Sequence, residues 1–106
     1  MADQSIVDKV KQYVLLLRKN GVDVAKTYLY GSFVTGKMHK DSDIDVLIVS
    51  KQFDEENDQL AGKTWRLVSQ IDSRIEPFVI GLNRFMTDDI SPLLHSIRNE
   101  GEEIIV

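Results

Sequence analysis

A short run that is nearly all β-branched or leucine residues, Ile44 to Val49, constrains the fold of this chain more than any other feature. Such a run is typical of a strand buried on both faces, and a strand of that kind lies in a sheet that helices cover on both sides. With 106 residues, the chain has room for one hydrophobic core. We therefore expect residues 1–106 to form a single domain around this strand.

The segments on either side of this run carry helical and strand patterns in alternation. Apolar spacing predicts helices over residues 6–17, 60–71 and 92–100, and β-forming residues predict strands over 27–30, 75–80 and 102–106. Ser5 is the expected N-cap of the first helix, and Asn20-Gly21 is its expected end. The alternation predicts an α/β (α+β) fold, with a small sheet of three to four strands flanked by helices.

The composition excludes several classes of protein. The chain has no cysteine, which excludes a disulfide scaffold, a thiolate zinc site and a cysteine nucleophile. Thirteen basic against seventeen acidic residues give a net charge of -4, so we expect no surface that tracks free nucleic acid. The start of the chain lacks the pattern of a signal peptide, and no apolar run is long enough to span a bilayer. We therefore expect a cytoplasmic protein with no membrane partner.

Polar residues gather between the first two predicted strands, and two known loop patterns fit them poorly. The segment Gly31 to Lys37 matches the P-loop pattern G-x-x-x-x-G-K, but Met38 stands where that loop needs Ser or Thr. The aspartates of residues 41–45 have the spacing that opens an EF-hand calcium loop, but Val46 stands where that loop needs glycine. Neither a P-loop nor a calcium loop is therefore expected.

The same residues fit better as one site for a metal and a phosphate. Asp43 and Asp45 are two residues apart, so on a strand their side chains project from the same face. Two carboxylates held together in partial burial repel each other unless a cation compensates, and such oxygen ligands suit Mg²⁺ or Mn²⁺. The turn at Gly31-Ser32 offers backbone N–H groups to phosphate oxygens. The simpler alternative is a solvated Asp-Ser-Asp turn before a strand.

The order of these residues matches a known signature. Gly31-Ser32, ten further residues and then Asp43-x-Asp45 follow the pattern G-S-x10-D-x-D. The chain thereby resembles the DNA polymerase β-like nucleotidyltransferase superfamily, and its size resembles the minimal nucleotidyltransferase (MNT) branch. The resemblance covers most of the chain, from the leading helix to the segment Pro92–Gly101. It implies the nucleotidyltransferase fold, in which a small mixed sheet is flanked by helices.

The resemblance also implies a third carboxylate from a later strand, and Glu76 is the candidate. Glu76 lies in the otherwise apolar segment from Ile75 to Ile80, where an ionised side chain needs a partner. The family usually has aspartate at this point, so the longer glutamate changes the spacing of ligands around a metal. Asp72 is the alternative, although it falls at the end of the second predicted helix and outside the strand.

The loop after the Gly-Ser turn departs from the family. Minimal members commonly carry Ala-Arg-Gly there, whereas this chain has Val34-Thr35-Gly36. The missing arginine removes a bidentate phosphate contact, and Lys37 could restore positive charge as a point contact. The residues that the resemblance assigns to nucleotide and phosphate binding are Gly31, Ser32, Gly36 and Lys37.

The implied reaction transfers a nucleoside monophosphate, most simply AMP from ATP, to a hydroxyl group. Asp43 and Asp45 would bind two Mg²⁺ ions, and Glu76 would bind the ion that activates the acceptor. Gly31 and Ser32 would hold the phosphates of the nucleoside triphosphate. Neither His39 nor His95 is required. We expect His39 in a loop, and His95 either on the surface or in helix packing.

The acceptor is expected on a partner protein, because the chain leaves no residues for a domain that would hold one. In the resembled family such a partner is a HEPN-domain ribonuclease, and the nucleotidyltransferase is its antitoxin, which attaches AMP to a tyrosine. Two alternatives stay open. A catalytically weak subunit could neutralise its partner by docking alone, and a stand-alone phosphohydrolase could direct the same metals at water.

Overall fold

The computed structural model describes residues 3–37 and 42–106, and within these residues four strands form one mixed sheet. The strands are β1 (Lys26–Tyr30), β2 (Ile44–Val49), β3 (Ile75–Ile80) and β4 (Glu102–Glu103). Their order across the sheet is β3-β2-β1-β4. Strand β1 is antiparallel to both of its neighbours, and β2 is parallel to β3. The predicted α/β fold with a small mixed sheet is confirmed, although β4 is shorter than the predicted 102–106.

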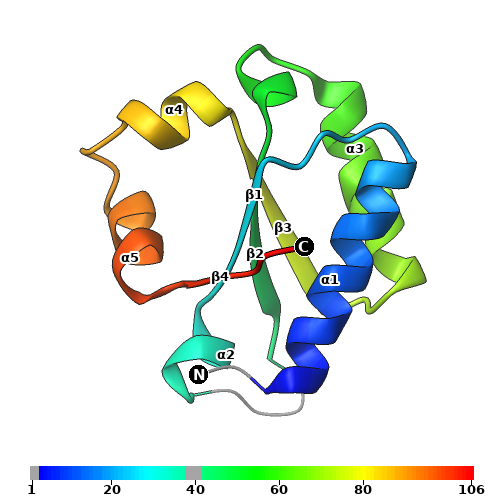
Figure 1. Ribbon diagram of the computed structural model, residues 1–106, viewed down its shortest axis with the longest axis vertical. Coiled ribbons are helices and arrows are strands. Elements are labelled where there is room, and N and C mark those ends of the chain that lie inside the picture. The colour runs from blue at the N-terminus through cyan, green and yellow to red at the C-terminus, as the bar shows by residue number, and fades with distance from the viewer. Residues whose placement is uncertain (1–2, 38–41) are drawn as a thin grey trace.

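Helices cover both faces of this sheet (Figure 1). The described helices are α1 (Gln4–Lys19), α2 (Ser32–Thr35), α3 (Asp58–Arg66), α4 (Leu82–Thr87) and α5 (Pro92–Glu100), with 3-10 turns η1 (Lys51–Phe53) and η2 (Leu67–Gln70). Helices α1 and α3 lie on one side of the sheet, α4 and α5 lie on the other, and α2 lies at the end where β1 stops (Figure 1). None of the helices in the described residues is both long enough and apolar enough to cross a membrane.

Helix α1 begins two residues earlier than the apolar stripe predicts, and its cap is not Ser5. Asp3 is the N-cap, in extended backbone conformation, and its carboxylate accepts a hydrogen bond of 2.8 Å from the Ser5 N–H. Aspartate and serine are both strong N-cap residues, so residue type alone did not separate them. The predicted end is confirmed, because Asn20 is the C-cap and Gly21 has a φ of 90°.

The second predicted helix, over residues 60–71, is wrong in its length and its uniformity. Helix α3 starts at Asp58, where the Asn57 side chain accepts from the Leu60 N–H at 3.0 Å. It ends at Arg66, and the chain tightens into η2 before it turns toward β3. Leu67 and Val68 of η2 are buried. Apolar residues three positions apart fit both α and 3-10 geometry, so the apolar pattern did not reveal the change from one to the other. Helices α2 and α4 and turn η1 are too short to show periodicity in the sequence.

Alternating side chains of β2 enter two separate cores. Ile44, Val46 and Ile48 pack with the apolar stripe of α1, and Leu47 and Val49 pack with α4 and α5. Both sets are fully buried, as the prediction of a strand covered on both faces requires.

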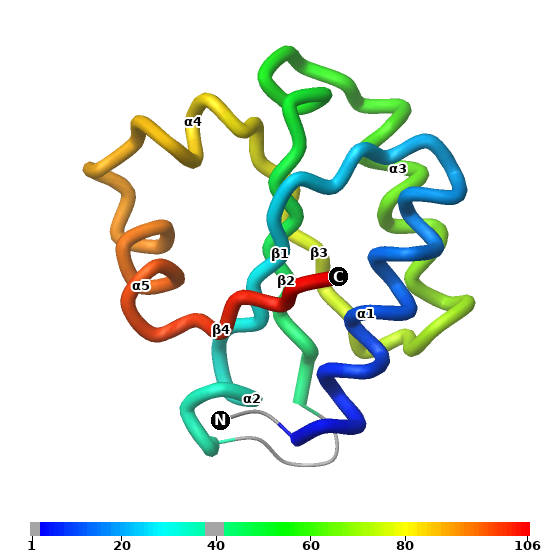
Figure 2. The backbone as a smooth tube through the Cα atoms, viewed as in Figure 1, coloured from blue at the N-terminus to red at the C-terminus, as the bar shows by residue number. Residues whose placement is uncertain are grey.

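The C-terminal segment of the chain passes beside β1 and contacts the end of α1. After β4 the chain runs toward α1 (Figure 2), and the Ile104 N–H donates to the Thr27 carbonyl at 2.8 Å. Arg18 of α1 then donates to the Val106 carbonyl at 3.1 Å.

The opposite edge of the sheet is β3, where Pro77 lies. An edge strand tolerates proline because one side of its backbone needs no sheet partner.

Candidate functional site

Asp45 and Glu76, which the sequence assigns to a metal site, lie side by side on neighbouring strands. The parallel register of β2 and β3 pairs Asp45 directly with Glu76. Neighbouring strands lie about 4.8 Å apart and register partners share a face, so the two carboxylates project together. Their face is the one that carries Leu47 and Phe78 toward α4 and α5. The structure therefore brings together two acids that are 31 positions apart in the sequence.

The electrostatics of Asp45 show that Asp43 belongs to the same group. Burial raises the pKa of the half-buried Asp45 carboxyl above its ordinary value, and the negative charges of Glu76 and Asp43 raise it further. Asp43 is exposed just before β2 begins, and Glu76 is exposed within β3. The three acids thus form a cluster of like charge, hereafter the acid cluster, with its most buried member in the middle.

The turn at Gly31 presses against this cluster. Gly31 follows β1 with a φ of 78°, a backbone conformation that side chains other than glycine rarely adopt. A Cβ atom at this position would overlap the Asp45 carboxylate oxygen Oδ2. Gly31 is therefore required twice, once by its backbone angle and once by the close approach of its backbone to Asp45.

The remaining candidates for phosphate binding follow in and after α2. Ser32 opens this four-residue helix, and its carbonyl accepts the N–H groups of Gly36 and Lys37, both at 3.1 Å. Gly36 ends the helix with a φ of 81°, and the Lys37 side chain is exposed. The Gly-Ser turn and the acid cluster are thus adjacent through Gly31, while the phosphate-binding roles of these residues stay predictions.

The acid cluster has the donors of a cation site without a finished coordination geometry. Within residues 3–37 and 42–106, no three or more Asp, Glu, His or Cys side chains are arranged to hold a metal ion. Among the same residues, no lysine or arginine forms an ion pair with Asp43, Asp45 or Glu76. The donor set fits Mg²⁺ in its chemistry, because it consists of hard carboxylate oxygens whose mutual repulsion a cation would relieve.

Tyr30 belongs to this environment and was not predicted from the sequence. It is the last residue of β1 and the antiparallel register partner of Asp45. Burial raises the pKa of the Tyr30 phenol to about 12, with smaller contributions from the charges of Asp45 and Glu76. The one feature of the sequence that could have indicated this role is the position of Tyr30 directly before Gly31. The residue before the turn ends the strand that pairs with the strand of Asp45.

Asp72, the alternative third ligand, has a different environment. Its carboxylate forms ion pairs with Lys9 at 2.6 Å and with Arg74 at 2.8 Å. These hydrogen bonds, above all those from Arg74, hold the pKa of Asp72 well below its ordinary value. A carboxylate already neutralised by two cations has little reason to bind a metal, so the alternative to Glu76 loses its support.

The two histidines are not part of this arrangement as far as the structure describes it. His39 lies outside the described residues. His95 is exposed on α5, where its Nε2 and the Asn99 side-chain nitrogen are 3.0 Å apart. Of the two positions predicted for His95, on the surface or in helix packing, the structure shows the surface position.

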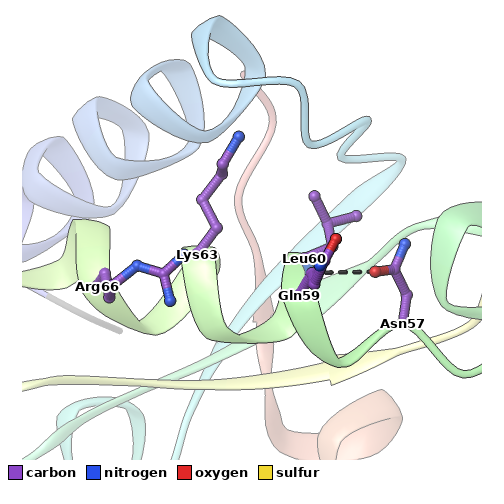
Figure 3. Close-up of a pocket in the computed structure, with 5 residues that line it drawn as sticks. All are labelled: Asn57, Gln59, Leu60, Lys63 and Arg66. Atoms are coloured by element: carbon purple, nitrogen blue, oxygen red, sulfur yellow. Dashed lines mark hydrogen bonds between the residues drawn. The ribbon is translucent and has the colours of Figure 1, made fainter.

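A surface hollow lies elsewhere, along α3 (Figure 3). It measures about 460 Å³ and is lined by Asn57, Gln59, Leu60, Lys63 and Arg66. Two of these side chains are engaged in the fold itself. Asn57 caps α3, and the Lys63 ammonium donates to the Asn20 carbonyl at 3.1 Å. Because α3 and the acid cluster lie on opposite faces of the sheet, we do not assign this hollow to the candidate site.

Comparison with known proteins gives this site a context. A family model described as a nucleotidyltransferase domain matches residues 7–94. No curated protein has a significant sequence match to this chain.

Several solved structures have a similar fold. A mutant of the toxin-antitoxin MntA-HpeT has a TM-score of 0.61 and 22% identity, and the match covers 90% of this chain and 71% of that one. A toxin-antitoxin with AMP-PNP has a TM-score of 0.60 and 21% identity, over 89% and 71%. The toxin-antitoxin MntA-HepT has a TM-score of 0.55 and 22% identity, over 97% and 72%. At these identities the likeness concerns the fold.

Proposed function

This chain belongs to the nucleotidyltransferase domain family, and from that premise we propose that it transfers AMP, or another nucleoside monophosphate, to a hydroxyl group on a partner protein. One observation carries the proposal. Asp45 and Glu76 share a register position beside Gly31, and Asp43 adds a third negative charge to them. A cluster of carboxylates next to a glycine turn suits a substrate made of phosphates and divalent cations.

The acid cluster is proposed to hold the cations. Asp43 and Asp45 would bind both Mg²⁺ ions, and Glu76 would bind the one on the acceptor side; Mn²⁺ suits the same donors. When bound, such ions neutralise the charge that develops on the attacking and departing oxygens. Support comes from the raised pKa of Asp45, because three acids without a paired lysine or arginine in the described residues favour a cation among them.

The other residues of the site would orient the reactants. The backbone at Gly31, the Ser32 hydroxyl and the Lys37 ammonium would hold the phosphates, and Gly36 would shape the loop. The acceptor oxygen would attack the α-phosphorus as the bond to pyrophosphate breaks, and its proton would pass to Glu76. Glu76 suits this role because it is an exposed carboxylate beside the more buried Asp45.

The partner is proposed to be a toxin of the HEPN type. Structures of toxin-antitoxin pairs have the same fold as this chain, and one of them contains AMP-PNP. The chain would then act as an antitoxin that attaches AMP to a tyrosine of its partner. A nucleoside triphosphate would be the donor substrate.

The direct test is transfer of a radiolabelled α-phosphate from ATP to the co-purified partner in the presence of Mg²⁺. We expect label on the partner with the parent protein and none with the double variant Asp43→Asn, Asp45→Asn. The matched control is Asp23→Asn, which removes one exposed carboxylate from the loop before β1. Equal labelling by the parent and the double variant would overturn the proposal.

A second candidate function is neutralisation by docking without catalysis. Two observations favour it, namely the loop without arginine at Val34-Thr35-Gly36 and the lack of a finished metal geometry in the described residues. Cells that express the partner separate the two functions. If the double variant still suppresses the toxicity of the partner, docking is sufficient for neutralisation. If the partner becomes toxic again, neutralisation requires nucleotide transfer.

A further inference from the structure

An ion pair at the start of β3 has a geometry that the transfer reaction does not explain. Arg74 binds Asp72 through two hydrogen bonds, from Nε to Oδ1 at 3.1 Å and from Nη2 to Oδ2 at 2.8 Å. The Asp72 side chain is only 11% exposed, and it also accepts from the Arg74 backbone N–H at 2.9 Å. Such a bidentate pair fixes the plane of the guanidinium group.

The fixed guanidinium group packs against α2. Its carbon Cζ lies over the Phe33 ring, 5.9 Å from the ring centre, at a distance where a cation is attracted to an aromatic face. Phe33 is buried and directly follows Ser32. Helix α2 has four residues, too few for helical hydrogen bonds alone to stabilise it, so its position depends on the packing of Phe33.

The backbone of Arg74 contacts a third part of the candidate site. Its carbonyl accepts a hydrogen bond of 2.8 Å from the N–H of Ile44, the residue between Asp43 and Asp45. Glu76 follows two positions later, on β3, which begins at Ile75. Arg74 therefore contacts α2 through Phe33 and the start of β2 through Ile44. It also lies two positions before Glu76, which is on β3. Lys9 ties the pair to α1, because its ammonium lies 2.6 Å from Asp72.

We propose that Arg74 is a positioning residue, which Asp72 holds in place so that Phe33 and the Gly31-Ser32 turn stay in register with the acid cluster. Arg74 itself contacts no reacting group in this scheme. It acts through Phe33, and its effect is to keep the turn that would hold the phosphates close to the acids that would hold the cations. The ligand of the turn rests on the proposed function, whereas the ordering of α2 does not.

Amide hydrogen exchange tests the ordering without nucleotide. The Thr35 and Gly36 N–H groups donate to the carbonyls of Gly31 and Ser32, both at 3.1 Å, and report directly on α2. In Arg74→Gln we expect these amides to exchange about tenfold faster, while amides in the centre of β1 and β2 change only with global stability. Phe33→Leu, which keeps the Asp72 pair and removes the aromatic face, should accelerate the same amides even if Arg74→Gln does not fold.

Transfer kinetics test the consequence for function. We expect KM for the nucleoside triphosphate to rise about tenfold in Arg74→Gln and Phe33→Leu, with kcat changed by less than about threefold. KM should rise less in Arg74→Lys than in Arg74→Gln, because lysine keeps the positive charge but cannot form the bidentate hydrogen bonds to Asp72. The control is Arg84→Gln, which removes an exposed ion pair with Asp88 in α4 and should change neither readout.

The outcomes separate this proposal from the proposed function. If the parent protein transfers no nucleotide but the α2 amides respond to Arg74→Gln or Phe33→Leu, the positioning role stands and the proposed function fails. If the parent transfers nucleotide and neither variant changes α2 exchange or KM, the positioning role is overturned and the proposed function stands.

Discussion

Two carboxylates at the same end of the sheet, Asp72 and Asp45, have opposite surroundings. Asp72 accepts hydrogen bonds from Lys9 and Arg74, which lower its pKa. Asp45 is half-buried beside Glu76 and Asp43, and burial and both charges raise its pKa. Cations in the protein stabilise the first carboxylate, whereas in the described residues the second has acids as its charged neighbours.

This difference distinguishes a carboxylate that stabilises the fold, Asp72, from one that is available to bind a cation, Asp45. A largely buried carboxylate with two bound cations contributes to folding, and the loss of one partner leaves an uncompensated charge. A carboxylate held among other carboxylates reduces the stability of the fold, and the cost is recovered when a cation binds. We therefore expect changes at Asp72 to affect stability first, and changes at Asp45 to affect activity first.

The largest expected effect is on transfer in Asp45→Asn. We expect kcat to fall by about two to three orders of magnitude, as for the loss of a preorganised charged group in a catalytic site. The free energy of unfolding should stay equal or rise slightly, because one of three like charges is removed. Steady-state transfer assays and urea denaturation measure the two effects. A variant with parent activity but lower stability would assign Asp45 to the fold instead.

The converse change, Asp72→Asn, should act mainly on folding. We expect the free energy of unfolding to fall by about 2 kcal/mol, less than for a fully buried pair because Lys9 and Arg74 are about one-third exposed. Urea denaturation measures it, with Asp88→Asn as the control for a more exposed pair. At a temperature where the variant is folded, kcat should stay within about tenfold of the parent. A stable variant would contradict the assignment of Asp72 to the fold.

The pH dependence of stability should show the same contribution of Asp72. Its folded pKa lies below the ordinary value of 3.8, so the ionised carboxylate stabilises the fold above about pH 4. This contribution is lost as the pH falls from about 4 toward the lower folded pKa. The difference in stability between the parent and Asp72→Asn should therefore be constant from pH 7 to 5 and shrink toward pH 3. Denaturation curves at these values of pH measure it, and a constant difference down to pH 3 would contradict it.

Added Mg²⁺ should stabilise the protein only when Asp45 is present, which tests its role as a cation ligand. At about ten times the dissociation constant, a cation bound to the acid cluster should raise the free energy of unfolding by about 1.4 kcal/mol. Asp45→Asn should lose this gain, and Asp72→Asn should keep it. Thermal melting with MgCl₂, against NaCl at equal ionic strength, measures the difference. Equal stabilisation of parent and Asp45→Asn would place the cation elsewhere.

The smallest effect is expected for Tyr30→Phe. Burial raises the pKa of the Tyr30 phenol to about 12, so the phenol is protonated at neutral pH and adds no charge to the acid cluster there. We expect stability to change by less than about 0.5 kcal/mol and kcat by less than about threefold. Melting curves and transfer assays check this. A larger loss of kcat than in Asp43→Asn would give the hydroxyl a direct role.

The sequence alone was sufficient for much of the fold and for the list of candidates. The run from Ile44 to Val49 predicted a strand covered on both faces, because all of its residues except Asp45 are β-branched or leucine. The Gly-Ser turn and Asp43-x-Asp45 could be found because both are local patterns, one in a turn and the other at the entrance of a strand. The cap at Asp3 and the break at Arg66 were missed, since residue type does not distinguish neighbouring caps or α from 3-10 geometry.

What the sequence by itself determined are the properties that nearest neighbours set: the buried strand, its acidic entrance and the glycine turn. Only the tertiary structure decided that Glu76 faces Asp45 and that Asp72 does not, because these depend on the register of β2 and β3 and on cations from distant segments. The physical reason is that register and ion pairing arise between elements far apart in the chain. Two acids four residues apart can thus have opposite charge environments.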